Sequence, residues 1–236
     1  IAAMVENGVD AVEIGLPYSD PLMDGPVIQA AVDSSLKAGT RIGDVMANVG
    51  GVVGTGAPTL VMSYWNPIER YGVDRFAREL ADAGGCGVIT PDLTPEEAGP
   101  WIEATDEHGI DRVFLVAPSS SDERIETVVR ACSGFVYAAS TMGVTGARTA
   151  VSSSAPELVS RVRQHTTLPV CVGLGVSTRA QAADVASYAD GVIVGSAFVK
   201  ALLDAESPGA GAAAAAALAA ELAAGVRGAS GVGVRA

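Results

Sequence analysis

Residues 9–26 read VDAVEIGLPYSDPLMDGP, so that an apolar stretch, VDAVEIG, passes directly into a polar loop rich in proline and aspartate. Six further short apolar runs follow along the chain: PTLVMSY from Pro58, CGVIT from Cys86, DRVFLVA from Asp111, FVYAAS from Phe135, LPVCVGLG from Leu168 and GVIVG from Gly191. Most of these runs are continuously apolar rather than alternating, which is typical of strands covered on both faces and therefore of a parallel sheet.

Amphipathic stretches typical of helices lie between the runs: FARELADAG from Phe76, TPEEAGPWIEATDEHG from Thr94, DERIETVVRACS from Asp122, APELVSRVRQH from Ala155 and TRAQAADVAS from Thr178. Strand and helix alternating in this way indicate repeated βα units. The pattern predicts an α/β fold of the (βα)8 TIM-barrel type. A doubly wound open sheet is the alternative, but no G-x-G-x-x-G motif follows the first run to favour it.

The seven runs predict seven strands, one fewer than an eight-stranded barrel requires. The chain begins with IAAMVENG, which has the pattern of the end of a helix. We therefore expect the barrel's first strand to lie upstream, and a chain without it to leave two strand edges open and to show little activity. We expect one barrel domain over residues 1–236: the end of the first helix (1–8), strands two to eight with their helices (9–203), and an Ala/Gly-rich helix and tail (204–236).

Composition narrows the functional class. The net charge is −12, from 15 Lys plus Arg and 27 Asp plus Glu, which argues against nucleic acid or an anionic membrane as partner. The alanine-rich tail is too weakly hydrophobic to be a convincing membrane span. The three cysteines, Cys86, Cys132 and Cys171, are too scattered for a disulfide framework or a metal site, so we expect free thiols, no metal and a cytoplasmic protein.

The longest steps between runs point to the functional face. The first step, from residue 9 to residue 58, covers 49 residues, and the fifth, from residue 135 to residue 168, covers 33. Extra length after a barrel strand enlarges the loops of the catalytic face. Glu13 lies within an otherwise apolar run, where a carboxylate is costly to bury unless it is neutral or paired. It is either a general acid–base with a raised pKa or a glutamate at a strand edge that reaches water.

Asp20 and Asp24 lie in the loop that follows. Such loops are usually only turns, but Asp24 beside Glu13 would give two carboxylates in different environments, the pattern of an acid–base pair. Further along, GLGVST and VGSAFVK each place glycine at a strand end and a polar residue near a helix start. Backbone N–H groups there bind phosphate without lysine or arginine, and strands seven and eight carry the usual phosphate site of barrels.

Seven segments occur in order between Ile1 and Lys200: VEIGLPYSDPLMDGP, YWNPIERYG, PDLTPEEA, FLVAPSSSDERI, STMGVTGAR, VGLGVST and VGSAFVK. Together they resemble the tryptophan synthase alpha subunit family. The resemblance implies a lyase that cleaves indole-3-glycerol phosphate to indole and glyceraldehyde 3-phosphate by a retro-aldol reaction, in L-tryptophan biosynthesis. It also implies no cofactor in this chain, and a beta subunit partner that uses pyridoxal phosphate, in an α2β2 heterotetramer.

The same resemblance implies roles for single residues. Glu13 matches the catalytic glutamate and Asp24 the catalytic aspartate; Tyr137 matches a wall of the indole pocket. Thr145 matches a threonine of the lid over the site. The remaining matches are Gly146, Gly175, Gly195 and Ser196 at the phosphate, and Asp20 and Pro21 on a loop that faces the beta subunit.

Two other functions fit parts of the pattern. Another phosphate-binding barrel acting on a sugar phosphate would share GLG and VGS but need not carry Glu13 and Asp24. A non-catalytic activator of the beta subunit would have no need of either carboxylate. The presence of both favours the lyase.

Overall fold

The computed structural model describes residues 1–140, 146, 154–173 and 175–229. All seven apolar runs form strands: β1 (Val12–Gly15), β2 (Thr59–Met62), β3 (Gly87–Ile89), β4 (Asp111–Val113), β5 (Leu115–Val116), β6 (Val136–Ala139), β7 (Val170–Gly173) and β8 (Gly191–Val192). The fourth run is divided at Phe114 into β4 and β5. The prediction that each of the seven runs forms strand is confirmed.

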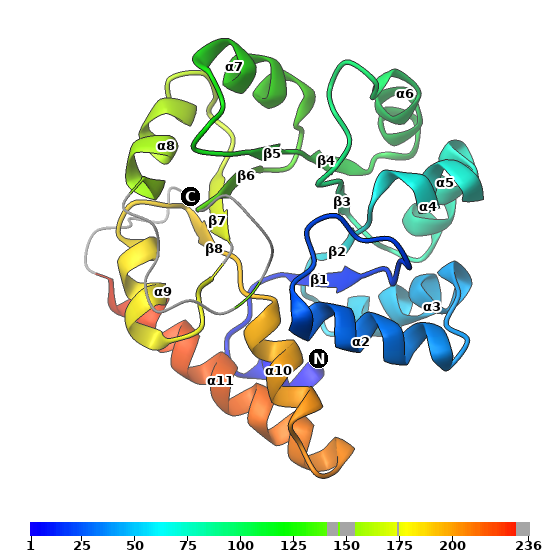
Figure 1. The fold of residues 1–236 in the computed structure, drawn as a ribbon, viewed down its shortest axis with the longest axis vertical. Helices are drawn as coiled ribbons and strands as arrows, with labels where there is room; N and C mark the ends of the chain where they lie inside the picture. The colour runs from blue at the N-terminus through cyan, green and yellow to red at the C-terminus, as the bar shows by residue number, and fades with distance from the viewer. Residues whose placement is uncertain (141–145, 147–153, 174, 230–236) are drawn as a thin grey trace.

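Every strand pair is parallel, and each strand pairs with its neighbour in the chain. The order is β1-β2-β3-β4 in one sheet and β5-β6-β7-β8 in the other, with β4 and β5 continuous along the chain. Figure 1 shows the strands at the centre with the helices around them, the arrangement of a βα barrel rather than of a doubly wound sheet. Among the described residues, β1 pairs only with β2 and β8 only with β7, so the strand expected upstream stays a prediction.

The helices are α1 (Ala2–Glu6), α2 (Pro26–Lys37), α3 (Ile42–Val53), α4 (Trp65–Tyr71), α5 (Val73–Asp82), α6 (Gly99–His108), α7 (Asp122–Ala131), α8 (Ala155–Val162), α9 (Arg179–Ala186), α10 (Ser196–Leu203) and α11 (Pro208–Gly228). The long first step therefore contains two helices, α2 and α3, in addition to the loop after β1. The expected start of a helix at Thr94 is wrong, because α6 begins at Gly99. Pro100 sits in its first turn, where a missing N–H is harmless; a helix from Thr94 would place this proline in its interior.

The core has two main parts, besides a small cluster of Val12, Val52 and Ala57. Leu60, Ile89, Val113 and Tyr137 fill the inside of the barrel. A larger cluster lies between strands and helices, and there Trp101, which is fully buried, meets the rings of Trp65 and Phe76 edge-on at 6.0 and 6.2 Å. Both tryptophans are therefore packing residues, Trp101 in the core and Trp65 partly buried against it.

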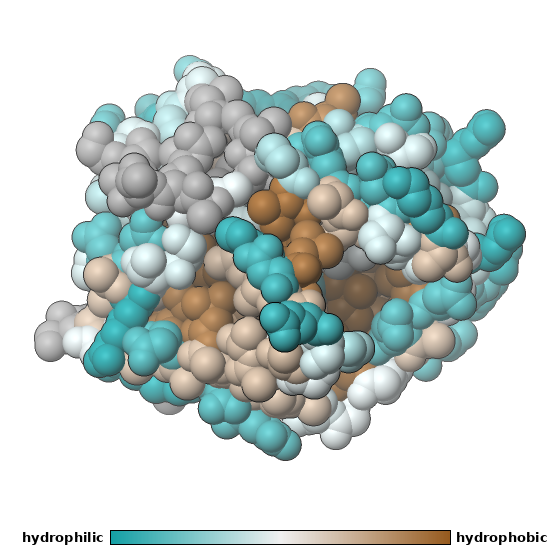
Figure 2. All heavy atoms as spheres, turned by 60° about the horizontal axis from the view of Figure 1, so that its bottom comes forward, coloured by the Kyte–Doolittle hydropathy of each residue, from teal (hydrophilic) through white to brown (hydrophobic). Residues whose placement is uncertain are grey.

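Helix α11 is the one helix in the described part that is long and apolar enough to cross a membrane. It packs against α9, α10 and α1, and it buries Ala215, Ala219 and Leu222. Figure 2 turns the lower edge of Figure 1 forward and shows hydrophilic side chains scattered over weakly hydrophobic surface, with strongly hydrophobic surface in the hollows. Small side chains permit the close packing, since a Cβ at Gly225 would lie 2.3 Å from the Arg179 carbonyl oxygen.

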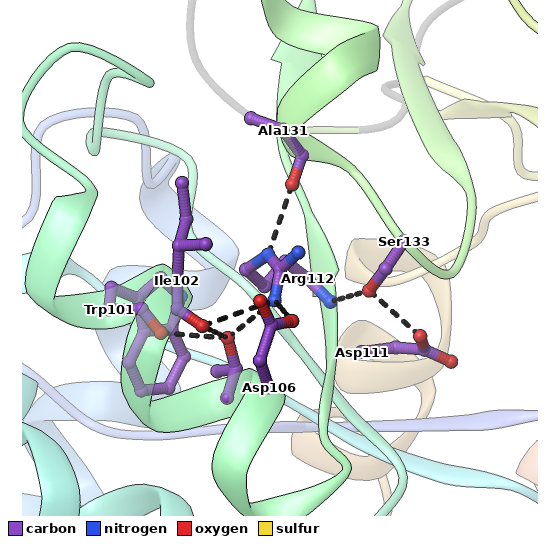
Figure 3. Close-up of polar contacts among 8 residues, drawn as sticks. Trp101, Ile102, Asp106, Asp111, Arg112, Ala131 and Ser133 are labelled. Carbon is purple, nitrogen blue, oxygen red and sulfur yellow. Dashed lines mark hydrogen bonds and ion pairs between the residues drawn. The ribbon is translucent and has the colours of Figure 1, made fainter.

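A buried arginine joins three elements near the amino-terminal end of β4 (Figure 3). Arg112 is 7% exposed, and its guanidinium donates hydrogen bonds to the Ala131 carbonyl oxygen at 3.1 Å and the Thr105 hydroxyl at 2.8 Å. It also forms an ion pair with Asp106. These contacts tie β4 to α6 and to the end of α7, on the side of the barrel away from the strands' carboxyl ends.

Candidate active site

The carboxyl ends of the strands surround a cavity of about 330 Å³. Seven residues singled out from the sequence line it: Glu13, Asp24, Tyr137, Gly146, Gly175, Gly195 and Ser196. They are spread along the chain from residue 13 to residue 196, and the parallel arrangement of the strands brings them together at one end of the fold. The eighth substrate-site residue expected from the sequence, Thr145, lies outside the described residues.

Glu13 is on β1, in register with Leu60 of β2, and its side chain faces the cavity. It is half-buried because the cavity reaches it. Burial raises the pKa of the Glu13 carboxyl from 4.5 to about 7. Among the described residues, none makes a hydrogen bond or ion pair with this carboxyl that would stabilise its charge. Glu13 can therefore exist as acid and as carboxylate near neutral pH, which suits proton transfer.

Asp24 lies in the loop between β1 and α2. Its Oδ1 accepts a hydrogen bond of 2.8 Å from the Tyr64 hydroxyl, and its carbonyl oxygen accepts one of 2.7 Å from the Gln29 amide. Burial raises the pKa of the Asp24 carboxyl, and the bond from Tyr64 acts against this by stabilising the charge. The two cavity carboxylates are thus in different surroundings: Glu13 has no donor among the described residues, whereas Asp24 has one.

Tyr137 is on β6, inside the barrel, and is 4% exposed. Burial and the nearby Glu13 carboxyl raise the pKa of its phenol, so the phenol stays protonated. Cys171, paired with Tyr137 across the β6–β7 ladder, has its thiol pKa raised to about 12 by burial first and by Glu13 second. Glu13, Tyr137 and Cys171 thus share one interior space, and near neutral pH Glu13 is the group among them that exchanges protons.

The opposite side of the cavity is built from glycines and a helix start. Gly195 is the N-cap of α10 and Ser196 its first residue, while Gly175 follows β7 with φ +108°, a conformation that favours glycine. The first N–H groups of α10 have no partner within the helix and offer a site for an anion. No lysine or arginine is among the described residues that line this cavity.

Asp20 and Pro21 lie in the same loop as Asp24 but outside the cavity lining. Asp20 is exposed and Pro21 half-exposed, and the adjoining Leu22 is 72% exposed. The loop therefore carries one cavity residue, Asp24, and a short outward-facing stretch with an apolar side chain.

Sequence reasoning missed Tyr64, Met62 and Ser63, which also line the cavity. They end the second apolar run, PTLVMSY, and the rule that functional side chains follow barrel strands would have pointed to them.

In the described part of the chain, one surface group has spacing that fits a metal ion. Asp74, Glu107 and His108 lie together between α5 and α6, with His108 Nε2 at 2.8 Å from Asp74. Asp74 is also paired with Arg78. The group is remote from the cavity, and none of its members lines it.

The family model of the tryptophan synthase alpha chain matches residues 1–227. The chain belongs to this family. The alpha chain of Acidothermus cellulolyticus is 59% identical over 229 residues, covering 96% of this chain and 84% of the relative, and that of Salinispora arenicola is 61% identical over 227 residues, covering 96% and 85%. A structure of Mycobacterium tuberculosis tryptophan synthase matches with a TM-score of 0.89 and 57% identity, covering 96% of this chain and 84% of that one.

Membership of the tryptophan synthase alpha chain family establishes the enzyme class. The protein is a lyase with a TIM-barrel fold that carries out the alpha reaction of L-tryptophan biosynthesis, the cleavage of indole-3-glycerol phosphate to indole and glyceraldehyde 3-phosphate. Its partner is the beta subunit of tryptophan synthase. The alternative of an unrelated phosphate-binding barrel acting on a sugar phosphate is set aside.

Proposed function

We propose that Glu13 and Asp24 are the catalytic residues of the alpha reaction in this chain. The observation that carries the proposal is the contrast between the two carboxyls in one cavity. Burial raises the pKa of Glu13 to about 7, and Asp24 is held by a tyrosine hydroxyl that favours its ionised form. A proton donor and a fixed negative charge are what a retro-aldol cleavage of this substrate needs.

In the proposed mechanism, the Glu13 acid first protonates indole C3, and a positive charge develops on the indole ring. Asp24 accepts a hydrogen bond from the indole N–H and stabilises that charge. The Glu13 carboxylate then takes the proton of the glycerol hydroxyl next to C3. The C–C bond breaks as the new carbonyl forms, which releases indole and glyceraldehyde 3-phosphate and restores protonated Glu13. No cofactor of this chain enters the proposed steps; pyridoxal phosphate is used by the beta subunit.

We propose that Tyr137 forms a wall of the indole pocket and that Gly146, Gly175, Gly195 and Ser196 bind the phosphate. The free N–H groups at the start of α10 and the glycines around them support this assignment, because they allow close approach of an anion. Thr145 is proposed as the lid residue that contacts Asp24 on closure. Its position lies outside the described residues.

Asp20 and Pro21 are proposed to face the beta subunit in an α2β2 heterotetramer. They form an outward-facing stretch with the exposed Leu22, in the loop that carries Asp24. This stretch supports the proposal, because a partner bound there would contact the loop of an active-site residue. We propose a cytoplasmic location, in keeping with free cysteines and a biosynthetic role. We also propose the single domain set out above, with residues 204–236 as C-terminal helix and tail.

The test is indole release from indole-3-glycerol phosphate, with and without the beta subunit. Glu13→Gln is expected to abolish cleavage and Asp24→Asn to lower it by several orders of magnitude, while circular dichroism stays unchanged. Glu126→Gln, at a half-exposed position on α7, is the matched control and should keep full activity. Near-normal turnover by Glu13→Gln would contradict the acid–base role. A folded parent chain that releases no indole yet stimulates the beta subunit would support the activator alternative.

A further inference from the structure

Tyr64 lies at the carboxyl end of β2, and its hydroxyl has two partners in the loop that carries Asp24. It donates to Asp24 Oδ1 at 2.8 Å, and it accepts from the Met23 backbone N–H at 2.9 Å. An N–H can only donate, so the phenol oxygen must be the acceptor in that second bond. The single phenol proton is then free to point at Asp24, which fixes the direction of the bond.

The phenol is itself held firmly. Tyr64 is 5% exposed, its ring packs against Tyr18 at 5.6 Å between centroids, and its carbonyl oxygen accepts a hydrogen bond of 2.8 Å from the Ser63 hydroxyl. The next residue, Trp65, donates its N–H to Asp92 Oδ1 at 2.9 Å, which ties the end of β2 to the segment after β3. A donor placed on a fixed strand end can keep the carboxyl of a loop residue in one orientation.

Such a tyrosine could either donate a hydrogen bond to a carboxylate or exchange a proton with the substrate, and the pKa of its phenol decides between these roles. Burial first, with Asp24 and Asp92 adding their charges, raises the pKa of the Tyr64 phenol far above neutrality. The phenol therefore remains a protonated donor at every pH at which the enzyme works. It is suited to hold a carboxylate and is unsuited to exchange protons with substrate.

We propose that Tyr64 is a positioning residue for Asp24: its hydroxyl, anchored by the Met23 N–H, holds the Asp24 carboxylate ionised and aimed into the cavity, where that carboxylate accepts the indole N–H. The inference rests on the proposed role of Asp24. It assigns to Tyr64 a share in the alpha reaction that it exerts through Asp24 alone.

The test is a double-mutant cycle in the indole-release assay with the alpha chain alone. Tyr64→Phe removes one oxygen and keeps the ring against Tyr18. A hydrogen bond to a charged group is worth about 1.5–3 kcal/mol, so kcat is expected to fall by about tenfold to a hundredfold with a smaller change in KM. In an Asp24→Asn background the same substitution should change kcat by less than about twofold. Tyr18→Phe removes the same atom from the neighbouring ring and should leave kcat within about twofold.

The outcomes separate the two proposals. Full activity of Asp24→Asn would overturn the role of Asp24 and the present inference with it. A loss of activity in Asp24→Asn combined with an unchanged kcat in Tyr64→Phe would overturn the inference alone. It would also be overturned if Tyr64→Phe lowered kcat by the same factor with Asn at position 24 as with Asp, because that result is expected of a merely structural residue. Urea unfolding of each variant shows that the compared proteins are folded.

Discussion

The phenol oxygen of Tyr137 occupies the space of the side chain that Gly173 lacks: a Cβ at Gly173 would lie 2.1 Å from it. Tyr137 on β6 pairs with Cys171 on β7, so Gly173 is the diagonal neighbour on the same face, two residues nearer the carboxyl end. The absent side chain lets the phenol lean along the strands toward the cavity. Gly173 therefore determines where the cavity wall stands.

Gly173→Ala is expected to displace Tyr137, because 2.1 Å is far below any contact distance between carbon and oxygen. Overpacking of a buried site of this kind lowers the free energy of unfolding by about 1–3 kcal/mol. We also expect a higher KM for indole-3-glycerol phosphate, since the displaced ring lines the cavity. Urea unfolding and steady-state kinetics measure the two effects.

Gly99→Ala is the matched control, because nothing lies within 4 Å of a Cβ at that exposed helix start. In a Tyr137→Ala background, Gly173→Ala should destabilise the protein much less, since the clashing ring is gone. An equal cost in both backgrounds would show that the strain at Gly173 does not come from Tyr137.

Glu13 predicts a pH-dependent stability with a definite sign. Its pKa is 4.5 as the ordinary value and about 7 in the folded chain, so folding favours the protonated form. The stabilisation is complete below pH 4.5 and is lost as the pH rises through 7. The difference between the two pKa values corresponds to about 3 kcal/mol. Glu13→Gln cannot ionise. The free energy of unfolding of this variant, taken relative to that of the parent, should therefore be up to about 3 kcal/mol higher at pH 8 than at pH 4, as measured by urea unfolding. An advantage that is the same at both pH values would refute the raised pKa.

Substitution of Arg112 is expected to lower the stability of the protein without lowering kcat. Arg112→Met removes the guanidinium that donates to the Ala131 carbonyl oxygen and the Thr105 hydroxyl, so the Ala131 oxygen loses this donor, while the Thr105 hydroxyl keeps its bond to the Trp101 carbonyl oxygen at 2.7 Å. The loss is expected to lower the free energy of unfolding by about 2–3 kcal/mol. The network lies near the amino-terminal end of β4, away from the cavity, so kcat of the folded variant should be unchanged.

Arg130→Met, at an arginine that is 75% exposed and paired with Glu126 on the surface of α7, serves as the comparison and should change stability by less than about 1 kcal/mol. Similar losses in the two variants would mean that burial of Arg112 contributes nothing.

The sequence was sufficient for those features that depend on neighbouring residues. Continuous apolar runs predicted where the strands lie, since a strand buried on both faces has few polar positions. Residues at the ends of those runs, Glu13, Gly175 and Gly195 among them, could be placed on one face because parallel strands in a barrel all point the same way. The start of α6 could have been read from Pro100, whose position limits where a helix begins.

Contacts between distant residues could not be predicted in this way. The bond from Tyr64 to Asp24 spans 40 positions in the chain, and the contact of Tyr137 with Gly173 depends on register between β6 and β7. The sequence around each of these residues does not indicate which distant residue it contacts. The separation of the two carboxyls into an unassisted Glu13 and a hydrogen-bonded Asp24 therefore had to come from the structure.

That separation predicts a bell-shaped dependence of kcat/KM on pH. Glu13 must begin protonated to supply indole C3, so activity should fall above a pKa of about 7, by tenfold for each further unit of pH. Asp24 must be ionised, so activity should also fall in acid. Tyr137 and Cys171, whose pKa values are raised well above this range, do not contribute.

Because the hydrogen bond from Tyr64 lowers the pKa of Asp24, Tyr64→Phe should move the acid limb to higher pH and leave the alkaline limb in place. The substrate's phosphate titrates near pH 6, so its own binding must be followed over the same range. An alkaline limb that moves with the Tyr64 substitution, or that is absent up to pH 9, would exclude Glu13 as the proton donor.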